Sequence, residues 1–312
     1  MNANASPSPS SVPELQRLRD NLNLAIVGKD EAITLVLVAL LCNGHALLED
    51  VPGVGKTLLA KSLATSIGGK FQRVQCTPDL LPSDITGTNI WNPKSGEFQF
   101  LPGPVFANVL LADEINRATP RTQSALLEVM EEQQVTVDGV TRAVDDPFFT
   151  IATQNPVEYQ GTFPLPEAQM DRFAIAFSLG YPTLDEELQM LQRLQTQPRN
   201  RALSPCLSLE QLQDLRSRCT QVKVEPSIQD YILSLVRQTR EHPEVALGVS
   251  PRGTVALQRT SQALAFLQGR EFVLPDDVKR IAPHVLVHRI VPSGGRSAKD
   301  IVRELLETIA VP

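Results

Sequence analysis

The stretch Ala46–Thr57 contains residue types that bind the phosphates of a nucleotide. It passes from an apolar run into a turn that holds Gly53 and Gly55, and then into a helical segment from Lys56 onward. Glycines let a backbone approach phosphate oxygens closely, and N–H groups at a helix start point toward negative charge. Lys56 is expected to reach the β- and γ-phosphates, and the Thr57 hydroxyl to bind Mg²⁺. The residues expected around the phosphates are Pro52, Gly53, Val54, Gly55, Lys56, Thr57 and Leu58.

One position departs from the usual G-x-x-x-x-G-K-[ST] pattern of such turns, because Asp50 stands where the first glycine is expected. A carboxylate repels phosphate, so we expect the side chain of Asp50 to point away from the nucleotide. A chance Gly-Lys-Thr in a surface turn is the alternative interpretation. The apolar run before the turn and the helical segment after it favour phosphate binding.

Two adjacent carboxylates, Asp113 and Glu114, end the apolar run that starts at Val109. A continuous apolar run is typical of a buried parallel strand, and open α/β sheets bind ligands at the carboxyl ends of their strands. Asp113 is expected to hold Mg²⁺ through water, and Glu114 to polarise the water that attacks the γ-phosphate. Acidic residues also favour the first turn of any helix. Together with Lys56, however, the pair favours hydrolysis of a bound triphosphate.

A neutral polar residue, Asn155, follows a further predicted strand that ends at Gln154. If this strand lies next to the one that ends at Asp113, Asn155 can orient the attacking water. An Asn-Pro pair also favours turns, so a turn role for Asn155 and Pro156 is the alternative.

Strands and helical segments alternate up to about residue 180, which predicts an α/β fold with a parallel sheet covered by helices on both faces. Helices are expected at Pro13–Leu22, capped by Ser11, and at Asp30–Cys42. Residues 1–11 are rich in Ser and Pro and are expected to be disordered. The first of five expected strands starts at Ala46, and the others are Phe71–Cys76, Val109–Asp113, Phe148–Gln154 and Phe173–Ser178.

Two insertions in this first domain have the pattern of β-hairpins. Residues 87–101 place a turn with Pro93 and Gly96 between apolar and aromatic residues. Trp91, the only tryptophan, lies in this insertion, where a partner contact and local packing are equally open. Residues 134–144 alternate valines around Asp138 and Gly139, a pair typical of two-residue hairpin turns.

From residue 181 onward the pattern changes to a series of amphipathic segments, which predicts a helical second domain. Asp185, Ser208 and Pro275 are residue types that open helices. The two domains are therefore expected at residues 12–180 and 181–312. The expected helices are Leu184–Leu194, Leu209–Cys219, Ser227–Glu241, Arg252–Leu267, Pro275–Val287 and Ala298–Ile309.

The composition narrows the classes of function. With 312 residues, of which 42% are apolar, the chain is long enough for two domains with a sizeable core. Its longest apolar run, Ala32–Cys42, is too short to span a bilayer, and we find no signal peptide. The net charge of −6 argues against attraction of the whole protein to nucleic acid or anionic lipid. Four cysteines without a C-x-x-C spacing indicate a reducing cytoplasm and no structural zinc.

Several stretches resemble motifs of ATPases of the AAA+ superfamily, and within it of the MoxR family. The Walker A motif is matched by Leu48–Thr57, including Asp50, the Walker B motif by Asp113–Ala118, and sensor 1 by Thr153–Pro156. Two further stretches, Leu165–Phe173 and Ser250–Gly253, also resemble the family. The resemblance extends over nearly the whole chain, from about Val12 to Pro312. It implies a P-loop AAA+ αβα sandwich with a five-stranded parallel sheet, followed by an all-α lid domain.

The resemblance also implies a homo-hexameric ring in which each nucleotide lies between two subunits. Arg172 then matches the arginine finger that reaches into the neighbour's site, and Arg252 matches the sensor 2 arginine of the lid. A guanidinium donates several N–H bonds to phosphoryl oxygens, and such a finger contributes about 10³- to 10⁵-fold in rate. A surface salt bridge is the alternative role for Arg172. Val27 and Gly28 match the position where relatives hold adenine.

The leading hypothesis is a cytoplasmic ATPase, with ATP and Mg²⁺ as cofactors, that remodels or matures a client protein as the resemblance implies. Relatives often act with a partner that carries a von Willebrand factor A domain. A DNA-acting motor is one alternative, but Arg142 is the only cation near the tip of the second hairpin, whereas a loop that tracks a nucleic-acid backbone needs Lys or Arg. A nucleotide-gated scaffold with little turnover is the other alternative.

Overall fold

The computed structural model describes residues 12–156, 161–196 and 203–312, and the tail expected to be disordered lies outside the described residues. At its centre lies a parallel sheet of β1 (Ala46–Glu49), β2 (Phe71–Gln75), β5 (Val109–Asp113), β8 (Phe149–Gln154) and β9 (Ile175–Phe177). The strand order is β2-β5-β8-β1-β9. The predicted five-stranded parallel sheet is thereby confirmed. Because β8 lies between β1 and β5, the residues that follow these three strands meet at one edge of the sheet.

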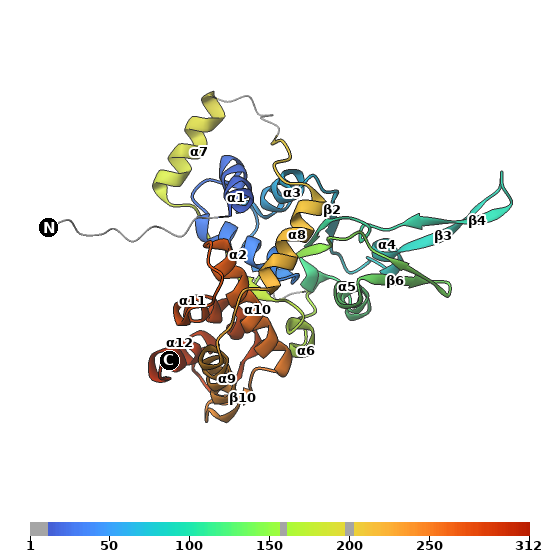
Figure 1. The fold of residues 1–312 in the computed structure, drawn as a ribbon. Coiled ribbons are helices and arrows are strands. Elements are labelled where there is room, and N and C mark those ends of the chain that lie inside the picture. Colours follow the sequence, from blue (N-terminus) through green and yellow to red (C-terminus); the bar gives the residue numbers. More distant parts are fainter. Residues whose placement is uncertain (1–11, 157–160, 197–202) are drawn as a thin grey trace.

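Helices cover both faces of this sheet. They are α1 (Pro13–Ala25), α2 (Asp30–Leu41), α3 (Lys56–Ser66), α4 (Pro82–Thr86), α5 (Pro120–Glu132) and α6 (Glu167–Met170), with a 3₁₀ turn at Ile115–Arg117. Leu111 and Ile151 belong to the apolar cluster that includes α1, α2 and α3. Leu110 and Ala152, one position away on the same strands, belong to the cluster that includes α4 and α5. This alternation along the strands produces the predicted αβα sandwich (Figure 1).

Helix α1 begins with a proline and without a side-chain cap from its N-cap residue. Its N-cap residue is Val12, whose side chain makes no capping hydrogen bond, and Pro13 is the first helical residue. A proline suits this position because the first N–H groups of a helix have no partner within the helix. The expected cap residue, Ser11, lies outside the described residues, and the helix starts at Pro13 as predicted.

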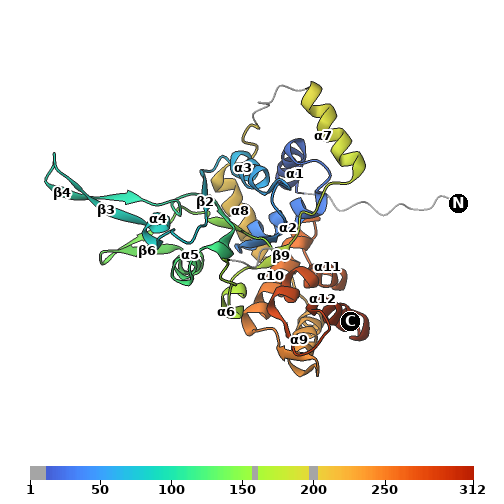
Figure 2. The ribbon, with the colours of Figure 1, turned by 180° about the vertical axis from the view of Figure 1, so that it is seen from behind.

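Both predicted hairpins are present, and they project from the same side of the molecule (Figure 1 and Figure 2). Their strands are β3 (Gly87–Asn92) with β4 (Glu97–Pro102), and β6 (Gln134–Val137) with β7 (Val140–Ala143). Asp138 and Gly139 form the second turn with φ values of 50° and 77°, which Asp-Gly pairs favour. Asn89 donates a hydrogen bond of 2.7 Å to the Asp138 carboxylate and so links the hairpins. Trp91 packs locally on Phe98, with ring centroids 5.2 Å apart, yet stays 55% exposed.

The second part of the described chain is helical, as predicted. Its helices are α7 (Leu184–Thr196), α8 (Leu209–Thr220), α9 (Pro226–Glu241), α10 (Pro251–Leu267), α11 (Pro275–Leu286) and α12 (Ala298–Thr308), with a 3₁₀ turn at Val287–Arg289. A short antiparallel pair, β10 (Val245–Leu247) with β11 (Val291–Pro292), adds to the helices. Ser208 caps α8, as expected, and accepts a hydrogen bond of 3.2 Å from the Gln211 N–H. The domain boundary at residue 181 stays a prediction.

One apolar cluster runs from α1, α2 and α3 into α8, α9, α10 and α11, so most of the helical part packs directly on the sandwich. Helix α7 instead lies beside α1, where Arg193 donates to the Leu24 carbonyl at 3.0 Å (Figure 2). Among the described helices, none is both long and apolar enough to cross a membrane. The four cysteines are free thiols.

His45 is a buried imidazole at the start of β1, and both of its ring nitrogens are satisfied. Nδ1 accepts a hydrogen bond from the Thr150 N–H at 3.0 Å, which leaves Nε2 to donate to the Met130 carbonyl at 2.9 Å. Burial lowers the pKa of His45 to about 4. The ring is therefore neutral in the folded protein at pH 7.

Lowering the pH from 7 to 4 is expected to reduce the free energy of unfolding by about 3 kcal/mol through His45. The pKa of His45 is about 6.5 in the unfolded chain and about 4 in the folded chain. The contribution of the neutral ring to stability is therefore complete above pH 6.5 and is lost as the pH falls through 4. Urea unfolding at a series of pH values measures the change.

His45→Gln is the matched control, because an amide can replace both hydrogen bonds and does not titrate. Burial also lowers the pKa values of His284 and His288, but these residues titrate in both proteins. The difference between the two pH profiles therefore isolates His45. Parallel profiles would contradict the inferred pKa.

Candidate active site

Residues from three separate segments line one cleft of about 420 Å³ at the carboxyl ends of β1, β2 and β5. They are Pro52, Gly53, Gly55, Lys56, Thr57, Leu58, Arg73, Gln75, Asp113 and Glu114. The structure thus brings the glycine turn and the acidic pair together, although they are far apart in the sequence. The side chain of Val54 packs against the apolar core, and its contact with phosphate stays a prediction.

The backbone of the turn has a conformation that requires glycine. Gly53 and Gly55 have φ values of 88° and 102°, in a region that side chains rarely adopt. A Cβ at either position would meet nothing within 4 Å, so the constraint is conformational and not steric. Helix α3 starts directly after Gly55, and the unpaired N–H groups of its first turn therefore begin at the cleft. The buried Lys56 directs Nζ to the Asp50 carbonyl at 3.0 Å.

The Asp50 side chain is directed to the segment that follows β9. Its Oδ1 accepts hydrogen bonds from the Ser178 hydroxyl at 2.6 Å and the Gly180 N–H at 3.1 Å, and Oδ2 accepts from the Leu179 N–H at 2.5 Å. With three donors, the buried carboxylate is held in a fixed orientation. The prediction that Asp50 points away from the nucleotide is confirmed. Its function is to attach the glycine turn to the start of the second part of the chain.

Thr153, on β8, holds both members of the acidic pair. Its hydroxyl donates to Asp113 Oδ1 at 2.7 Å and accepts from the Glu114 N–H at 2.8 Å. Glu114 has a φ of 57°, in the left-handed region that costs a non-glycine residue about 1 kcal/mol or more. Thr153 thus fixes the strained backbone of Glu114 and the carboxylate of Asp113 together.

Two residues of the cleft, Arg73 and Gln75, were not predicted. Arg73 donates to Asp113 Oδ2 at 2.7 Å, and Gln75 donates to Glu114 Oε2 at 2.8 Å. These contacts exist because β2 pairs directly with β5, which a sequence does not reveal. Polar residues at alternate positions of β2 are the signal that could have identified them. Burial and the two carboxylate charges raise the pKa of the neighbouring Cys76 thiol to about 12, so it is not a nucleophile at pH 7.

Asn155 is buried and follows β8, whose neighbours are β1 and β5. The condition set for its role, that its strand lies beside the strand ending at Asp113, is therefore met. Asn155 is not among the residues that line the cleft.

Val27 and Gly28 belong to a loop that meets the start of α7. Lys29 donates to the Tyr181 carbonyl at 3.0 Å and pairs with Glu186 at 3.7 Å. Gly28 has a φ of 69°, which favours glycine, and a Cβ there would lie 2.1 Å from the Glu186 carboxylate, so a larger residue would displace this side chain. The expected adenine position is thus bounded by the segment that joins the two parts of the chain.

Arg172 and Arg252 do not line the cleft and lie together elsewhere. Both bind the carboxylate of Glu131 at the end of α5, where Arg172 Nε lies 3.2 Å from Oε2 and Arg252 Nη2 contacts Oε1. Arg252 lies in the first turn of α10, in the helical part, as expected for a lid residue. Its side chain, however, lies beside Arg172 and not beside the phosphate turn of its own subunit. Glu131 and this pairing were not predicted, and no local sequence signal indicates them.

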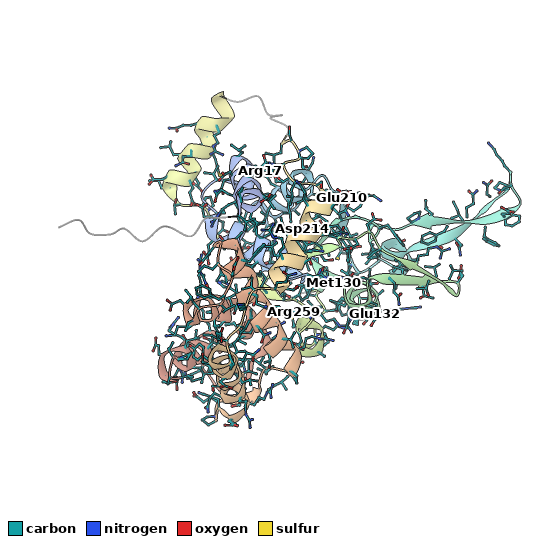
Figure 3. The ribbon with its side chains drawn as sticks, in the orientation of Figure 1. Arg17, Met130, Glu132, Glu210, Asp214 and Arg259 are labelled. Atoms are coloured by element: carbon teal, nitrogen blue, oxygen red, sulfur yellow. The ribbon has the colours of Figure 1, made fainter. Side chains whose placement is uncertain are left out.

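A second cleft, of about 470 Å³, lies beside Arg172 and is lined by polar side chains. Its residues are Ser124, Glu128, Glu132, Gln134, Gln169 and Arg172. In Figure 3 this cleft can be found by Glu132, the last residue of α5, which is labelled close to Met130. The side chains of Arg172 and Arg252 are 28% and 46% exposed there, so an approaching anion can reach both.

Residues 45–175 match the ATPase family associated with various cellular activities (AAA), and residues 237–305 match the AAA lid domain. YeaC of Bacillus subtilis (strain 168), an uncharacterized protein, is 50% identical over 96% of this chain and 95% of its own. A crystal structure of a candidate ATPase from Cytophaga hutchinsonii has a TM-score of 0.90 and 38% identity, covering 96% of this chain and 95% of that one.

The protein named Chaperone MoxR1 of Mycobacterium tuberculosis is 40% identical over 97% of this chain and 84% of its own. A Methylorubrum extorquens protein named MoxR is 29% identical over 95% of this chain and 94% of its own. These relatives span both parts of the fold, including the cleft and the lid. This chain therefore belongs to the AAA+ ATPases, in the MoxR family.

Proposed function

We propose that the chain hydrolyses ATP with Mg²⁺ in a homo-hexameric ring and uses the free energy to remodel or mature a client protein. The observation that carries the proposal is the single cleft that contains Lys56, Thr57, Asp113 and Glu114. Its volume of about 420 Å³ lies within the usual size of small-molecule pockets. A glycine turn, a lysine and an acidic pair in one cleft are the parts that phosphoryl transfer needs.

The oxygen donors of the cleft fit Mg²⁺. Thr57 supplies a hydroxyl and Asp113 a carboxylate to the same space, and Mg²⁺ prefers such hard oxygen ligands together with water. Thr57 would hold the ion directly and Asp113 through water. When bound, the ion neutralises the charge that develops on the β- and γ-phosphates.

The residues at the acidic end of the cleft would position and activate water. Glu114 polarises the attacking water, and the bonds from Thr153 and Gln75 fix its backbone and carboxylate. Asn155, one strand away, orients that water. Lys56 and the N–H groups of the turn bind the phosphates, while Val27 and Gly28 contact the adenine.

Arg172 and Arg252 would act on the nucleotide of a neighbouring subunit. Support comes from their place outside their own cleft, at a surface where both guanidinium groups already share one carboxylate. In the free subunit, each of the two guanidinium groups contacts one carboxylate oxygen of Glu131. In the ring, phosphate oxygens would take the place of this carboxylate. A second subunit would add the guanidinium groups of Arg172 and Arg252 to a cleft in which Arg73 already pairs with Asp113.

A client protein and a partner with a von Willebrand factor A domain belong to this proposal, and so does a cytoplasmic location. The name Chaperone MoxR1 of a relative that is 40% identical supports the remodelling role. The two projecting hairpins, with Trp91 and Phe98 exposed, offer a surface for such contacts (Figure 1).

Lys56→Ala is expected to weaken binding of Mg²⁺-ATP by about 10- to 100-fold, because one charge-assisted contact contributes about 1.5–3 kcal/mol. Isothermal titration calorimetry of the purified protein measures the affinity. Lys61→Ala is the matched control, since Lys61 is exposed on the same helix α3 and outside the cleft. Equal affinities of both variants would overturn the assignment of the cleft.

Measurement of ATPase rates in the same preparations separates the alternative functions. A DNA-acting motor would gain rate on addition of single-stranded DNA, and the gain would fall with salt. The structure offers little for such a role, since the Arg142 guanidinium lies 4.0 Å from the ring centroid of Phe100 and is engaged there. A scaffold would bind ATP and show the same low rate with and without Glu114.

A further inference from the structure

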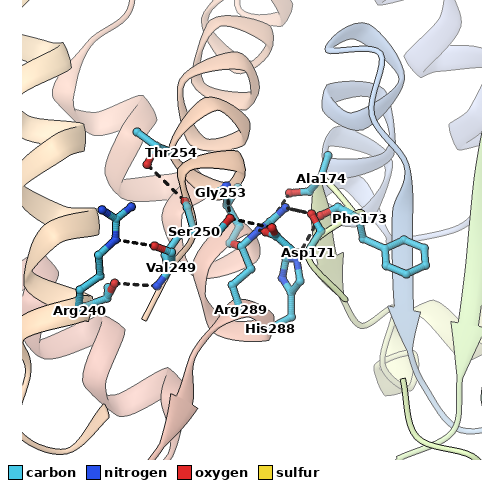
Figure 4. Close-up of polar contacts among 12 residues, drawn as sticks. Asp171, Phe173, Ala174, Arg240, Val249, Ser250, Gly253, Thr254, His288 and Arg289 are labelled. Atoms are coloured by element: carbon cyan, nitrogen blue, oxygen red, sulfur yellow. Dashed lines mark hydrogen bonds and ion pairs between the residues drawn. The ribbon is translucent and has the colours of Figure 1, made fainter. Parts of the chain in front are cut away.

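Asp171 and Ser250, both partly buried, and the buried Arg289 form a junction between the sandwich and the helical part (Figure 4). Asp171 precedes Arg172, and Ser250 lies two residues before Arg252. Arg289 comes from the 3₁₀ turn after α11 and is only 5% exposed. The junction therefore lies directly behind the two arginines that share Glu131.

Arg289 holds the backbone on both sides of Arg172. Its Nε donates to Asp171 Oδ1 at 2.7 Å, and Nη2 donates to the carbonyls of Phe173 at 2.6 Å and Asp171 at 3.1 Å. Nη1 reaches the Ala174 carbonyl at 3.3 Å. One planar guanidinium thus fixes three residues that flank Arg172, one before it and two after it, which a flexible ammonium could not do.

Asp171 extends the same network to Arg252. Its second oxygen accepts a hydrogen bond of 2.7 Å from the Ser250 hydroxyl. Ser250 is the N-cap of α10 and accepts from the Gly253 N–H at 3.1 Å. A Cβ at Gly253 would lie 2.9 Å from Arg289 Cδ, so the helix start also packs closely on Arg289.

The charges in this junction depend on one another. Burial lowers the pKa of Arg289, and the carboxylate of Asp171 opposes that shift, while the positive charge of Arg252 adds to it. Asp171 is therefore the anion that compensates the charge of a buried guanidinium beside a second arginine. Without that anion, Arg289 would be a buried charge with an unpaired side, which is strongly unfavourable.

We propose that Asp171 and Arg289 are positioning residues that hold Arg172 and Arg252 as one unit for the phosphates of the neighbouring subunit. The inference rests on the proposed function, because it gives both arginines a role in trans. It adds that the two arginines do not move independently. A misplacement of about 1 Å at such a group can cost about 10²-fold in rate.

Asp171→Asn tests this inference in the full-length protein. The expected result is a fall in kcat of about 10- to 100-fold, with ATP affinity in the subunit's own cleft changed less than about twofold. Asp277→Asn is the matched control, because Asp277 forms a similarly buried pair with Arg270 at 2.5 and 2.6 Å inside the helical part. Asp277→Asn is expected to destabilise the protein but leave kcat close to that of the original chain.

Mixed rings show whether Asp171 acts through the arginines. Asp171→Asn subunits keep an intact cleft, and Lys56→Ala subunits keep intact arginines, so rings that contain both are expected to recover activity. The two subunits are co-expressed with different tags and purified through both. A purely structural role of Asp171 predicts no recovery, since the defect would remain in the subunit with the intact cleft.

Ser250→Ala keeps the inference testable if Asp171→Asn does not fold. This change removes the bond to Asp171 and the cap of α10, whereas Ser297→Ala removes the equivalent cap of α12, a bond of 3.1 Å from the Asp300 N–H, and a bond to the Asp300 carboxylate within the same helix. Only Ser250→Ala is expected to lower kcat, by about 3- to 10-fold. Equal kcat values in the two serine variants would overturn the inference.

The proposed function fails separately. If action in trans is wrong, rings that mix Arg172→Ala and Lys56→Ala subunits recover no ATPase activity. If that mixture recovers activity while Asp171→Asn and Ser250→Ala retain full kcat, the arginines act in trans but the junction does not position them.

Discussion

Arg172→Ala is expected to lower kcat for ATP hydrolysis by about 10³- to 10⁵-fold, the range of arginine fingers. ATP affinity should change little, because Arg172 does not line the cleft of its own subunit. A guanidinium in trans matters mainly in the transition state, when charge spreads over the phosphoryl oxygens. Steady-state ATPase rates together with calorimetric affinities measure both quantities.

The mixture of Arg172→Ala and Lys56→Ala subunits carries the strongest test of action in trans. Each variant alone has no complete site, but an interface between the cleft of one and the arginines of the other does. Recovered activity would require two subunits per site. Arg237→Ala is the control for loss of an exposed arginine, since Arg237 lies on α9 in the helical part. Loss of rate in Arg172→Ala with no recovery in mixed rings would place its role within one subunit.

Glu114→Gln is expected to lower the rate of hydrolysis by about 10²- to 10⁴-fold while ATP stays bound. Glutamine keeps the size of the side chain and can still bond to Gln75, so the cleft should retain its shape. What it loses is the basic carboxylate that polarises water. Single-turnover hydrolysis and release of labelled ATP separate chemistry from binding.

The same variant, loaded with ATP, is expected to retain clients that the active protein releases. Capture with Glu114→Gln should therefore exceed capture with Lys56→Ala, which lacks the bound nucleotide. Glu307→Gln, a change of an exposed residue on α12, is the control for loss of one charge. Faster release of ATP from Glu114→Gln than from the original chain would show that Glu114 binds nucleotide and does not serve in hydrolysis.

Much of the fold could be predicted because its signals are local. The apolar run before Asp113 became β5, and the Asp138-Gly139 pair became a hairpin turn, since strand periodicity and turn chemistry act over a few residues. Ser208 became a helix cap for the same reason. The end of α1 was less predictable: it lies at Ala25 and not at Leu22, because the last turn of a helix depends on a few residues more or less.

The candidate site could be predicted where one segment contains the whole chemistry. The glycine turn with Lys56 and Thr57, and the acidic pair after β5, each carry their function in consecutive residues. Even the orientation of Asp50 followed from its charge at a phosphate turn. The sequence alone therefore indicated a nucleotide-binding cleft and the family to which the chain is similar.

Only the tertiary structure decided which residues surround that chemistry. The order β2-β5-β8-β1-β9 placed Arg73 and Gln75 on the acidic pair. Arg289 binds Asp171 across 118 positions of the chain, and Arg252 meets Glu131 across 121. Such contacts depend on how the layers of the fold pack against one another, and the sequence around one residue of a pair does not indicate its partner. For this reason the place of Arg252 beside Arg172, and the junction behind them, emerged only from the folded chain.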